Sequence, residues 1–254
     1  MAFDPRGFRG YLFDLDGTLI DTAPDICAAV NHSLEQFGYG PAPESMVRHW
    51  VGYGGKACIE QAVAAADAQA AGASPFHRRP AGVDGHAPGP RQPAKSPAES
   101  PTAVDPALVD AMLEPFLDHY GAHIADMSRP YPHTVATLRN LSERGAKLAV
   151  VTNKRIELTR KLLDALELTP WFDVIVGGDT AANPKPAPDP IYHACHDIGL
   201  SPGEILFVGD SETDVNASRA AGCRVVCVPD GYNHGIAPER LGADAIIGSL
   251  ADLI

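Results

Sequence analysis

The stretch GYLFDLDGT, at residues 10–18, is the part of the sequence that indicates the fold most strongly. Its apolar residues run as far as Leu15, and the following Asp16 and Gly17 are typical of a turn. We therefore expect a short buried strand, followed by a turn that carries acidic side chains. A helix should begin after Thr22, because Thr22 and Asp25 have the spacing of a capping box and apolar residues then recur at helical spacing.

The second half of the chain alternates between helical patterns and short apolar runs. We predict helices over residues 134–144, 155–168, 190–199 and 214–221, and strands over residues 147–152, 173–176, 205–208, 224–228 and 245–247. Apolar strands that alternate with helices form parallel sheets with both faces covered. The sequence therefore predicts an α/β fold with a doubly wound parallel sheet.

A block without strands separates the first strand from this alternation. Further helices are predicted near residues 44–50, 56–70 and 107–124, so we expect an all-helical cap domain inserted into the core. The expected core domain comprises residues 1–20 and 128–254, and the expected cap comprises residues 21–127. Within the cap, residues 71–106 are rich in proline, glycine and alanine and lack apolar periodicity, which is typical of a disordered insertion.

The composition is that of an ordinary globular protein, with 45% hydrophobic and 20% charged residues among 254. A formal net charge of −12 argues against nucleic-acid and membrane partners, because it repels phosphate backbones and anionic lipids. No apolar run approaches the ~20 residues of a membrane span, and the first eight residues lack the apolar core of a secretory signal. The five cysteines form no CxxC pair, which favours reduced thiols in a cytoplasmic protein.

Polar side chains follow four of the predicted strands at the point where each strand ends. In chain order they are Asp14, Asp16, Thr152, Asn153, Lys185, Asp210 and Asp214. Ligands of open parallel sheets bind outside the carboxyl ends of the strands, so we expect these groups to converge. Clustered carboxylates favour a bound cation, and oxygen ligands together with phosphate suit Mg²⁺. Such a site suits phosphoryl transfer, for which an aspartate nucleophile is an established route.

Each of these groups also has a simpler structural interpretation. An Asp-x-Asp pair is common in turns, Ser211 and Asp214 have the spacing of a capping box, and Lys185 could be a solvated loop lysine. The functional interpretation is favoured because all four groups follow the correct ends of predicted strands in one chain.

The same segments resemble the four motifs of haloacid dehalogenase superfamily phosphatases. They are FDLDGTLIDT at residues 13–22, VTNK at 151–154, KP at 185–186 and GDSETD at 209–214. The resemblance implies a Rossmann-like core with a helical cap of the superfamily's first type. It also implies that Asp14 is the nucleophile of an aspartyl-phosphate mechanism and that Asp16 is the general acid and base. An aspartate at position 16 disfavours the dehalogenase branch, because displacing a halide requires no acid for the leaving group.

The resemblance assigns the remaining motif residues to binding. It implies that Thr152, Asn153 and Lys185 bind the phosphate of a small-molecule phosphate ester. It also implies a Mg²⁺ cofactor, held by the Asp14 carboxylate, the Asp16 carbonyl and Asp210, with Asp214 in a supporting role.

Four shorter tracts resemble bacterial phosphoglycolate phosphatases. They are VRHWVGYGG at residues 47–55, RPYP at 129–132, GGD at 177–179 and GYNHG at 231–235. The resemblance implies hydrolysis of 2-phosphoglycolate to glycolate and phosphate. Two features depart from it, namely the insertion at 71–106 and His133, which stands where such proteins usually have glycine.

Three alternatives stay open at this point. The same chemistry could serve another small ester, such as a sugar phosphate, an amino-sugar acid phosphate or pyrophosphate. The chain could instead be a mutase of the β-phosphoglucomutase kind. A catalytically idle binding protein on the same fold is the third, and the intact Asp14, Asp16, Lys185 and Asp210 argue against it.

The carboxylate of 2-phosphoglycolate would need donors from the cap, because the core edge is already crowded with aspartates. The cap offers Arg48, Gly54, Gly55 and Lys56, which include a glycine-rich turn before a helix whose amides could bind an anion. Turn geometry alone explains the glycines equally well, and Arg48 and Lys56 could be solvated surface residues.

Overall fold

A computed structural model describes residues 3–70 and 104–254. Its main sheet has six parallel strands in the order β5-β4-β1-β6-β7-β8. Phe13 pairs with Val150 on one side and Val208 on the other, so β1 lies in the middle of the sheet. The strands are β1 (Gly10–Phe13), β4 (Lys147–Val151), β5 (Val174–Val176), β6 (Ile205–Gly209), β7 (Arg224–Cys227) and β8 (Ala245–Ile246).

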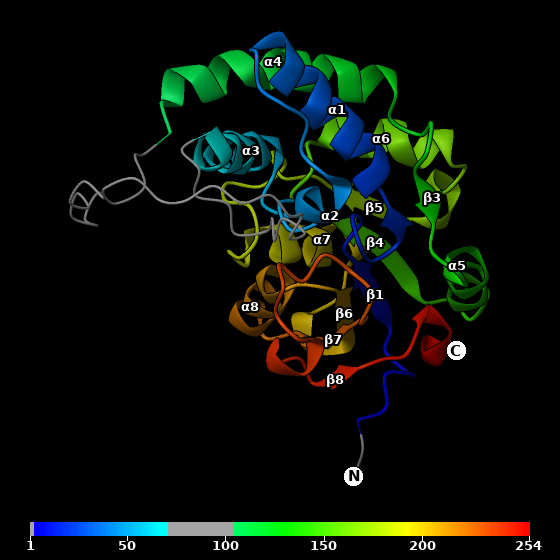
Figure 1. Cartoon of the computed structure of the whole chain (residues 1–254). Coiled ribbons are helices and arrows are strands. Elements are labelled where there is room, and N and C mark those ends of the chain that lie inside the picture. Colours follow the sequence, from blue (N-terminus) through cyan, green and yellow to red (C-terminus); the bar gives the residue numbers. More distant parts are fainter. Residues whose placement is uncertain (1–2, 71–103) are drawn as a thin grey trace, which may run out of the picture.

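Helices cover both faces of the sheet, which confirms the predicted doubly wound α/β fold (Figure 1). Successive strand residues point to opposite faces, so Leu12 packs in one apolar cluster while Tyr11 and Phe13 pack in the other. The cluster around Leu12 includes residues of α7 (Asp189–Ile198) and α8 (Glu212–Ala221). The other includes residues of α5 (Thr134–Glu143) and α6 (Ile156–Ala165).

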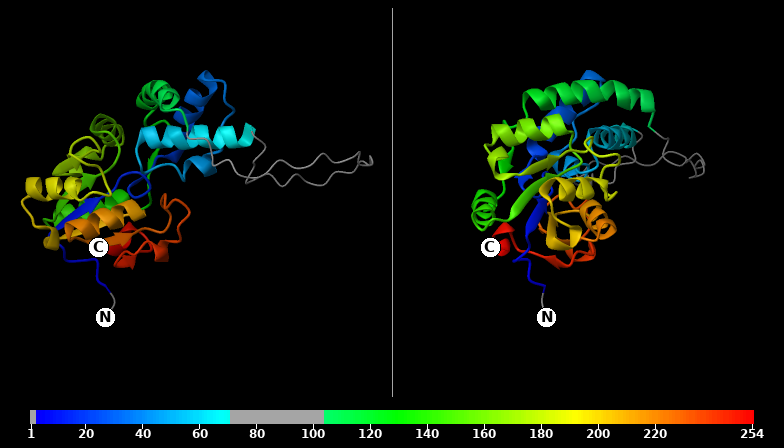
Figure 2. Two further views of the ribbon diagram at one scale, coloured as in Figure 1. Left: turned by 90° about the vertical axis from the view of Figure 1, so that its left-hand side faces the viewer. Right: turned by 180° about the vertical axis from the view of Figure 1, so that it is seen from behind.

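The helices described between residues 22 and 128 form a separate group at the carboxyl ends of the strands (Figures 1 and 2). They are α1 (Ala23–Gln36), α2 (Glu44–Val47), α3 (Gly55–Ala70) and α4 (Pro106–Ala122). The Ser33 hydroxyl donates a 2.8 Å hydrogen bond to the Met112 carbonyl and so joins α1 to α4. Met112, Phe116 and Tyr120, spaced four residues apart, form a buried stripe on α4, whereas Leu108 is only partly buried.

A short antiparallel ribbon joins this group to the core, and the sequence analysis missed it. Strand β2 (Ile20–Asp21) pairs with β3 (Arg129–Pro130) at the two places where the chain crosses between the parts. Two residues per strand are too few for any periodicity to be visible in the sequence. The expected domain boundaries, after residue 20 and before residue 128, both lie at this ribbon.

The capping box predicted from Thr22 and Asp25 at the start of α1 is absent. The side chain of Thr22 makes no capping hydrogen bond, and its hydroxyl instead donates to Asp16 Oδ1 at 2.6 Å. The Asp25 carboxylate accepts from the backbone of Met127 and Ser128 and from the Ser128 hydroxyl, at 2.6–3.1 Å. Both side chains therefore serve tertiary contacts. By contrast, the capping box predicted at Ser211 is present at the start of α8.

Most of the proline-rich stretch predicted over residues 71–106 lies outside the described residues. At its end, the Asp105 side chain caps α4 by accepting from the Ala107 amide at 2.9 Å. Helix α4 begins at Pro106, so its first residue belongs to that stretch. None of the helices in the described ranges is both long and apolar enough to cross a membrane. Short 3₁₀ helices complete the chain at Thr169–Trp171, Pro202–Glu204, Pro238–Arg240 and Leu250–Leu253.

Candidate active site

Lys185 lies at the centre of the predicted strand-end cluster. Its ammonium is 2.9 Å from Asp14 Oδ1 and 2.6 Å from Asp214 Oδ1, and it donates to the Val151 carbonyl at 2.7 Å. Because β1 lies between β4 and β6, the residues that follow these three strands meet at one place. The loop before α7 adds Lys185 to them. The structure therefore brings together the strand-end groups that the sequence predicts.

Three buried carboxylates form a group that could hold a metal ion. Oxygen atoms of Asp14, Asp210 and Asp214 lie within 4.8 Å of one another. Burial raises the pKa of Asp14 to about 7, although Lys185 opposes this rise. Burial, together with the charges of Asp214 and Asp14, raises the pKa of Asp210 well above its ordinary value. One lysine thus leaves negative charge uncompensated, and a divalent cation with oxygen ligands would offset it.

Asp214 has little capacity left to ligate a metal. Its Oδ1 accepts from Lys185, and its Oδ2 accepts from the backbone of Asp210 and Ser211 and from the Ser211 hydroxyl, at 2.9–3.1 Å. These contacts fit the supporting role that the resemblance implies. They also suit the capping interpretation, because the same carboxylate closes the capping box of α8.

Backbone packs closely around the Asp210 carboxylate, at positions where only glycine leaves enough space. A Cβ atom on Gly17 or Gly231 would collide with this carboxylate. Asp210 also accepts from the Thr18 hydroxyl at 3.3 Å and from the Tyr232 amide. The carboxylate is therefore held in one position beside Asp14, as a ligand for a cation would need to be.

Asp16 is held by contacts from the helical group and from the strand end after β4. Its Oδ1 accepts from the Thr22 hydroxyl at 2.6 Å and from the Lys154 ammonium at 2.7 Å. Lys154 also donates to the Tyr120 hydroxyl at 3.0 Å, so its ammonium joins Asp16 to α4. Lys154 lies inside the VTNK motif, but no sequence pattern predicts its role, because lysines are usually exposed.

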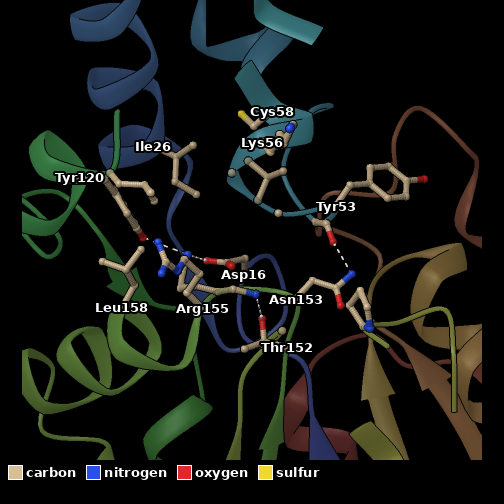
Figure 3. A pocket seen from close by; sticks show the side chains of 18 of the residues that line it. Asp16, Ile26, Tyr53, Lys56, Cys58, Tyr120, Thr152, Asn153, Arg155 and Leu158 are labelled. Carbon is tan, nitrogen blue, oxygen red and sulfur yellow. Dashed lines mark hydrogen bonds and ion pairs between the residues drawn. The ribbon is translucent and has the colours of Figure 1, made fainter. Parts of the chain in front are cut away.

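Thr152 and Asn153 follow β4 directly and face the same site. The Thr152 hydroxyl is buried and accepts from the Lys154 amide at 3.2 Å. The Asn153 side chain donates to the Gly52 carbonyl at 3.0 Å and to the Lys185 carbonyl at 2.9 Å. Asn153 therefore links the strand end to the glycine-rich turn of the helical group (Figure 3).

A cavity of about 360 Å³ lies between the core and the helical group. Its core side includes Asp14, Asp16 and residues 152–155. Its other side is largely apolar and includes Ile26, Val51, Cys58, Leu113, Phe116 and Leu117. The candidate nucleophile therefore lines a partly open cavity whose opposite side is largely apolar.

The four cap residues expected to bind the carboxylate of the substrate do not all line the cavity. Gly54, Gly55 and Lys56 line the cavity, and Lys56 Nζ lies 2.5 Å from Asp110 with 57% of its side chain exposed. Arg48 is not among the residues that line the cavity. Its guanidinium instead pairs with Asp21 at 3.0 Å and Glu44 at 2.8 Å, because β2 and α2 present these two carboxylates to it.

The glycine-rich turn also has a conformational reason for its composition. Gly52 and Gly54 have φ values of 116° and 90°, in the left-handed region that favours glycine. His133 adopts a φ of 71° in the same region, which favours the glycine that the resemblance leads us to expect at this position.

The chain matches the family model described as haloacid dehalogenase-like hydrolase over residues 11–228. It is 35% identical, over 97% of its length, to phosphoglycolate phosphatases of Shigella boydii serotype 4 (strain Sb227) and Escherichia coli (strain K12), and covers 91% of each. The crystal structure of a predicted phosphoglycolate phosphatase from Haemophilus somnus 129pt superposes with a TM-score of 0.80 at 31% identity, and the match covers 96% of both chains. The extent of the family match and the identity to these relatives show that the chain belongs to the haloacid dehalogenase-like hydrolase family.

Proposed function

We propose that this protein is a Mg²⁺-dependent phosphomonoesterase that hydrolyses 2-phosphoglycolate to glycolate and phosphate. The observation that carries the proposal is the pairing of Lys185 with Asp14 beside Asp210, with Asp14 lining the cavity. The names of the relatives support the choice of substrate. The residues proposed for catalysis and for binding are those that the sequence motifs predict.

The first half of the reaction transfers the phosphoryl group to Asp14. A carboxylate oxygen of Asp14 bonds to phosphorus while the bond between phosphorus and the ester oxygen breaks. Asp16 gives its proton to that ester oxygen, so glycolate leaves as the alcohol. Lys185, the Thr152 hydroxyl and the backbone amide of Asn153 would bind the phosphoryl oxygens during the transfer.

The second half returns the enzyme to its starting state. Asp16, now a carboxylate, takes a proton from a water molecule whose oxygen bonds to phosphorus. The bond between phosphorus and Asp14 breaks, which regenerates the Asp14 carboxylate and releases inorganic phosphate. Asp14, the Asp16 carbonyl and Asp210 would hold Mg²⁺, which when bound supplies positive charge opposite the phosphoryl oxygens.

Two further parts of the proposal concern the setting of the enzyme. We place the core domain at residues 1–20 and 128–254 and the cap at residues 21–127. We also assign a cytoplasmic location, which the composition and the five free cysteines support.

A screen of small phosphate esters with Mg²⁺ present tests this function. Phosphate release should be fastest, by kcat/KM, with 2-phosphoglycolate, and it should stop when the metal is chelated. The panel should include sugar phosphates, an amino-sugar acid phosphate and pyrophosphate. A low rank for 2-phosphoglycolate would remove this substrate, and conversion of one sugar phosphate isomer to another would indicate a mutase.

A further inference from the structure

Three cationic side chains among the described residues line the cavity, and they differ in exposure. The side chains of Lys56 and Arg155 are 57% and 60% exposed, and each lies near an acidic partner, Asp110 and Asp179 respectively. The side chain of Lys154 is only 7% exposed. Lys154 is therefore the one buried cation on the lining of this cavity within residues 3–70 and 104–254.

The Lys154 ammonium has one N–H group without a hydrogen-bond acceptor among the described residues. Two of its three N–H groups have acceptors, at Asp16 and at the Tyr120 hydroxyl. Asp16 Oδ1 lies 2.7 Å from the ammonium, and the two side chains are only 7% and 8% exposed, so the opposite charges pair inside the protein. The third N–H group is therefore available to an anion in the cavity.

The position of Lys154 relative to Asp16 fits the geometry of a 2-phosphoglycolate molecule. As the general acid, Asp16 must contact the ester oxygen, and the carboxyl carbon lies only two bonds beyond that oxygen. Lys154 Nζ is 2.7 Å from Asp16, whereas the roof of the cavity above is apolar. A carboxylate at this place would meet Lys154 before any other buried cation of the described residues.

We propose that Lys154 binds the second anionic group of the substrate and so selects phosphate esters of 2-hydroxy carboxylates. This inference rests on the proposed function, and it identifies the residue that binds the carboxylate of the substrate. The specificity contact then comes from the strand end after β4 rather than from Arg48, which is paired with Asp21 and Glu44.

A different role for Lys154 is to hold Asp16 in place and nothing more. Both roles would lower activity when Lys154 is replaced, but only the binding role depends on the tail of the substrate. A substrate pair that differs by one carboxylate therefore separates them.

The test compares wild type with Lys154→Met and Lys154→Gln in the full chain with Mg²⁺. The substrate pairs are 2-phosphoglycolate with ethyl phosphate, and 2-phospholactate with isopropyl phosphate. Wild type should prefer the acid member of each pair. Both variants should reduce that preference by about ten- to a hundredfold, mainly through KM for the acid member, because a charge-assisted contact is lost.

Two features of the design guard against misleading results. Lys154→Gln keeps an N–H donor for Asp16 and Tyr120. If circular dichroism shows that Lys154→Met does not fold, Lys154→Gln alone tests whether residue 154 binds the carboxylate of the substrate. Lys161→Met is the matched control, because Lys161 is an exposed lysine on α6, and it should leave the preference unchanged.

The possible outcomes distinguish this proposal from the proposed function. Equal losses on both members of a pair would overturn the binding role and leave the function standing. A wild-type preference for the acid members with 2-phospholactate well ahead of 2-phosphoglycolate, abolished in the variants, would remove the substrate but support Lys154. No wild-type preference for the acid member of either pair would overturn both.

Discussion

The ammonium of Lys185 lies 2.9 Å from the carboxylate of Asp14, although the two residues come from opposite halves of the chain. Both side chains are almost fully buried, and Lys185 also contacts Asp214 at 2.6 Å. This lysine is therefore a structural counter-ion as well as a candidate phosphate ligand. Its two roles make different predictions for stability and for activity.

Replacing the nucleophile should separate catalysis from folding. Asp14→Asn keeps the shape of the side chain but removes its nucleophilic charge, so hydrolysis should fall by several orders of magnitude. Thermal unfolding should be unchanged or occur at a slightly higher temperature, because Asp14 no longer repels Asp210 and Asp214. Near-native turnover by this variant would exclude the aspartyl-phosphate mechanism.

Removing the buried counter-ion should damage the fold as well as the activity. Lys185→Met leaves Asp14 and Asp214 without their shared cation, and breaking such a buried pair costs about 3–5 kcal/mol. Urea denaturation measures this loss. The control is Lys147→Met, because Lys147 pairs with Asp173 on the surface, where such pairs contribute about 0–1 kcal/mol. A Lys185 variant as stable as this control would contradict the account.

Stabilisation by Mg²⁺ should depend on pH. The folded-state pKa of Asp14 is raised to about 7, so without metal the folded protein binds a proton that the unfolded chain releases near pH 4. That contribution to stability is present below about pH 4 and is lost as pH rises through about 7. Mg²⁺ competes with this proton, so it should raise the melting temperature more at pH 8 than at pH 5.5. 

Asp210→Asn provides the comparison for the metal experiment. This variant lacks one proposed ligand, so its melting temperature should respond weakly to Mg²⁺ at both pH values. An equal stabilisation of wild type at pH 5.5 and pH 8, or an undiminished response of Asp210→Asn, would show that the ion binds elsewhere.

Asp25 should be essential for stability although it lies outside the site. Its buried carboxylate accepts from the backbone of Met127 and Ser128, near the ribbon that joins the two parts. Asp25→Ala should cost several kcal/mol in urea denaturation, since each buried donor left unpaired costs about 1–3 kcal/mol. Asp126→Ala, which removes an exposed carboxylate, should cost far less.

Most of the core was predictable because its signals are local. The run that ends at Leu15 and the later apolar runs mark strands, and the candidate site uses polar groups that follow β1, β4 and β6 and the loop after β5. The convergence of these groups was expected, because ligands of open parallel sheets bind at the carboxyl ends of the strands. The four motifs add the roles of Asp14, Asp16, Lys185 and Asp210, which remain predictions until they are tested by mutation.

What the sequence could not reveal depends on contacts between distant segments. Thr22 and Asp25 have the spacing of a cap, but their side chains contact Asp16 and Ser128 instead. The sequence shows no distant partner for Arg48, but the ribbon of β2 and β3 places Asp21 beside it. Lys154 is buried only because Asp16 and the Tyr120 hydroxyl meet it there, and no local pattern signals that burial.

The most direct test of the central claim, transfer of the phosphoryl group to Asp14, is to trap the intermediate. Asp16→Asn cannot deprotonate the attacking water, but p-nitrophenolate leaves without an acid, so the phosphorylated enzyme should accumulate. Rapid mixing with p-nitrophenyl phosphate and Mg²⁺, followed by acid quench and peptide mass spectrometry, locates the group. We expect a burst of about one p-nitrophenolate per enzyme molecule and a phosphoryl group on Asp14. Turnover without any phosphorylated enzyme, or a phosphoryl group on another residue, would contradict this expectation.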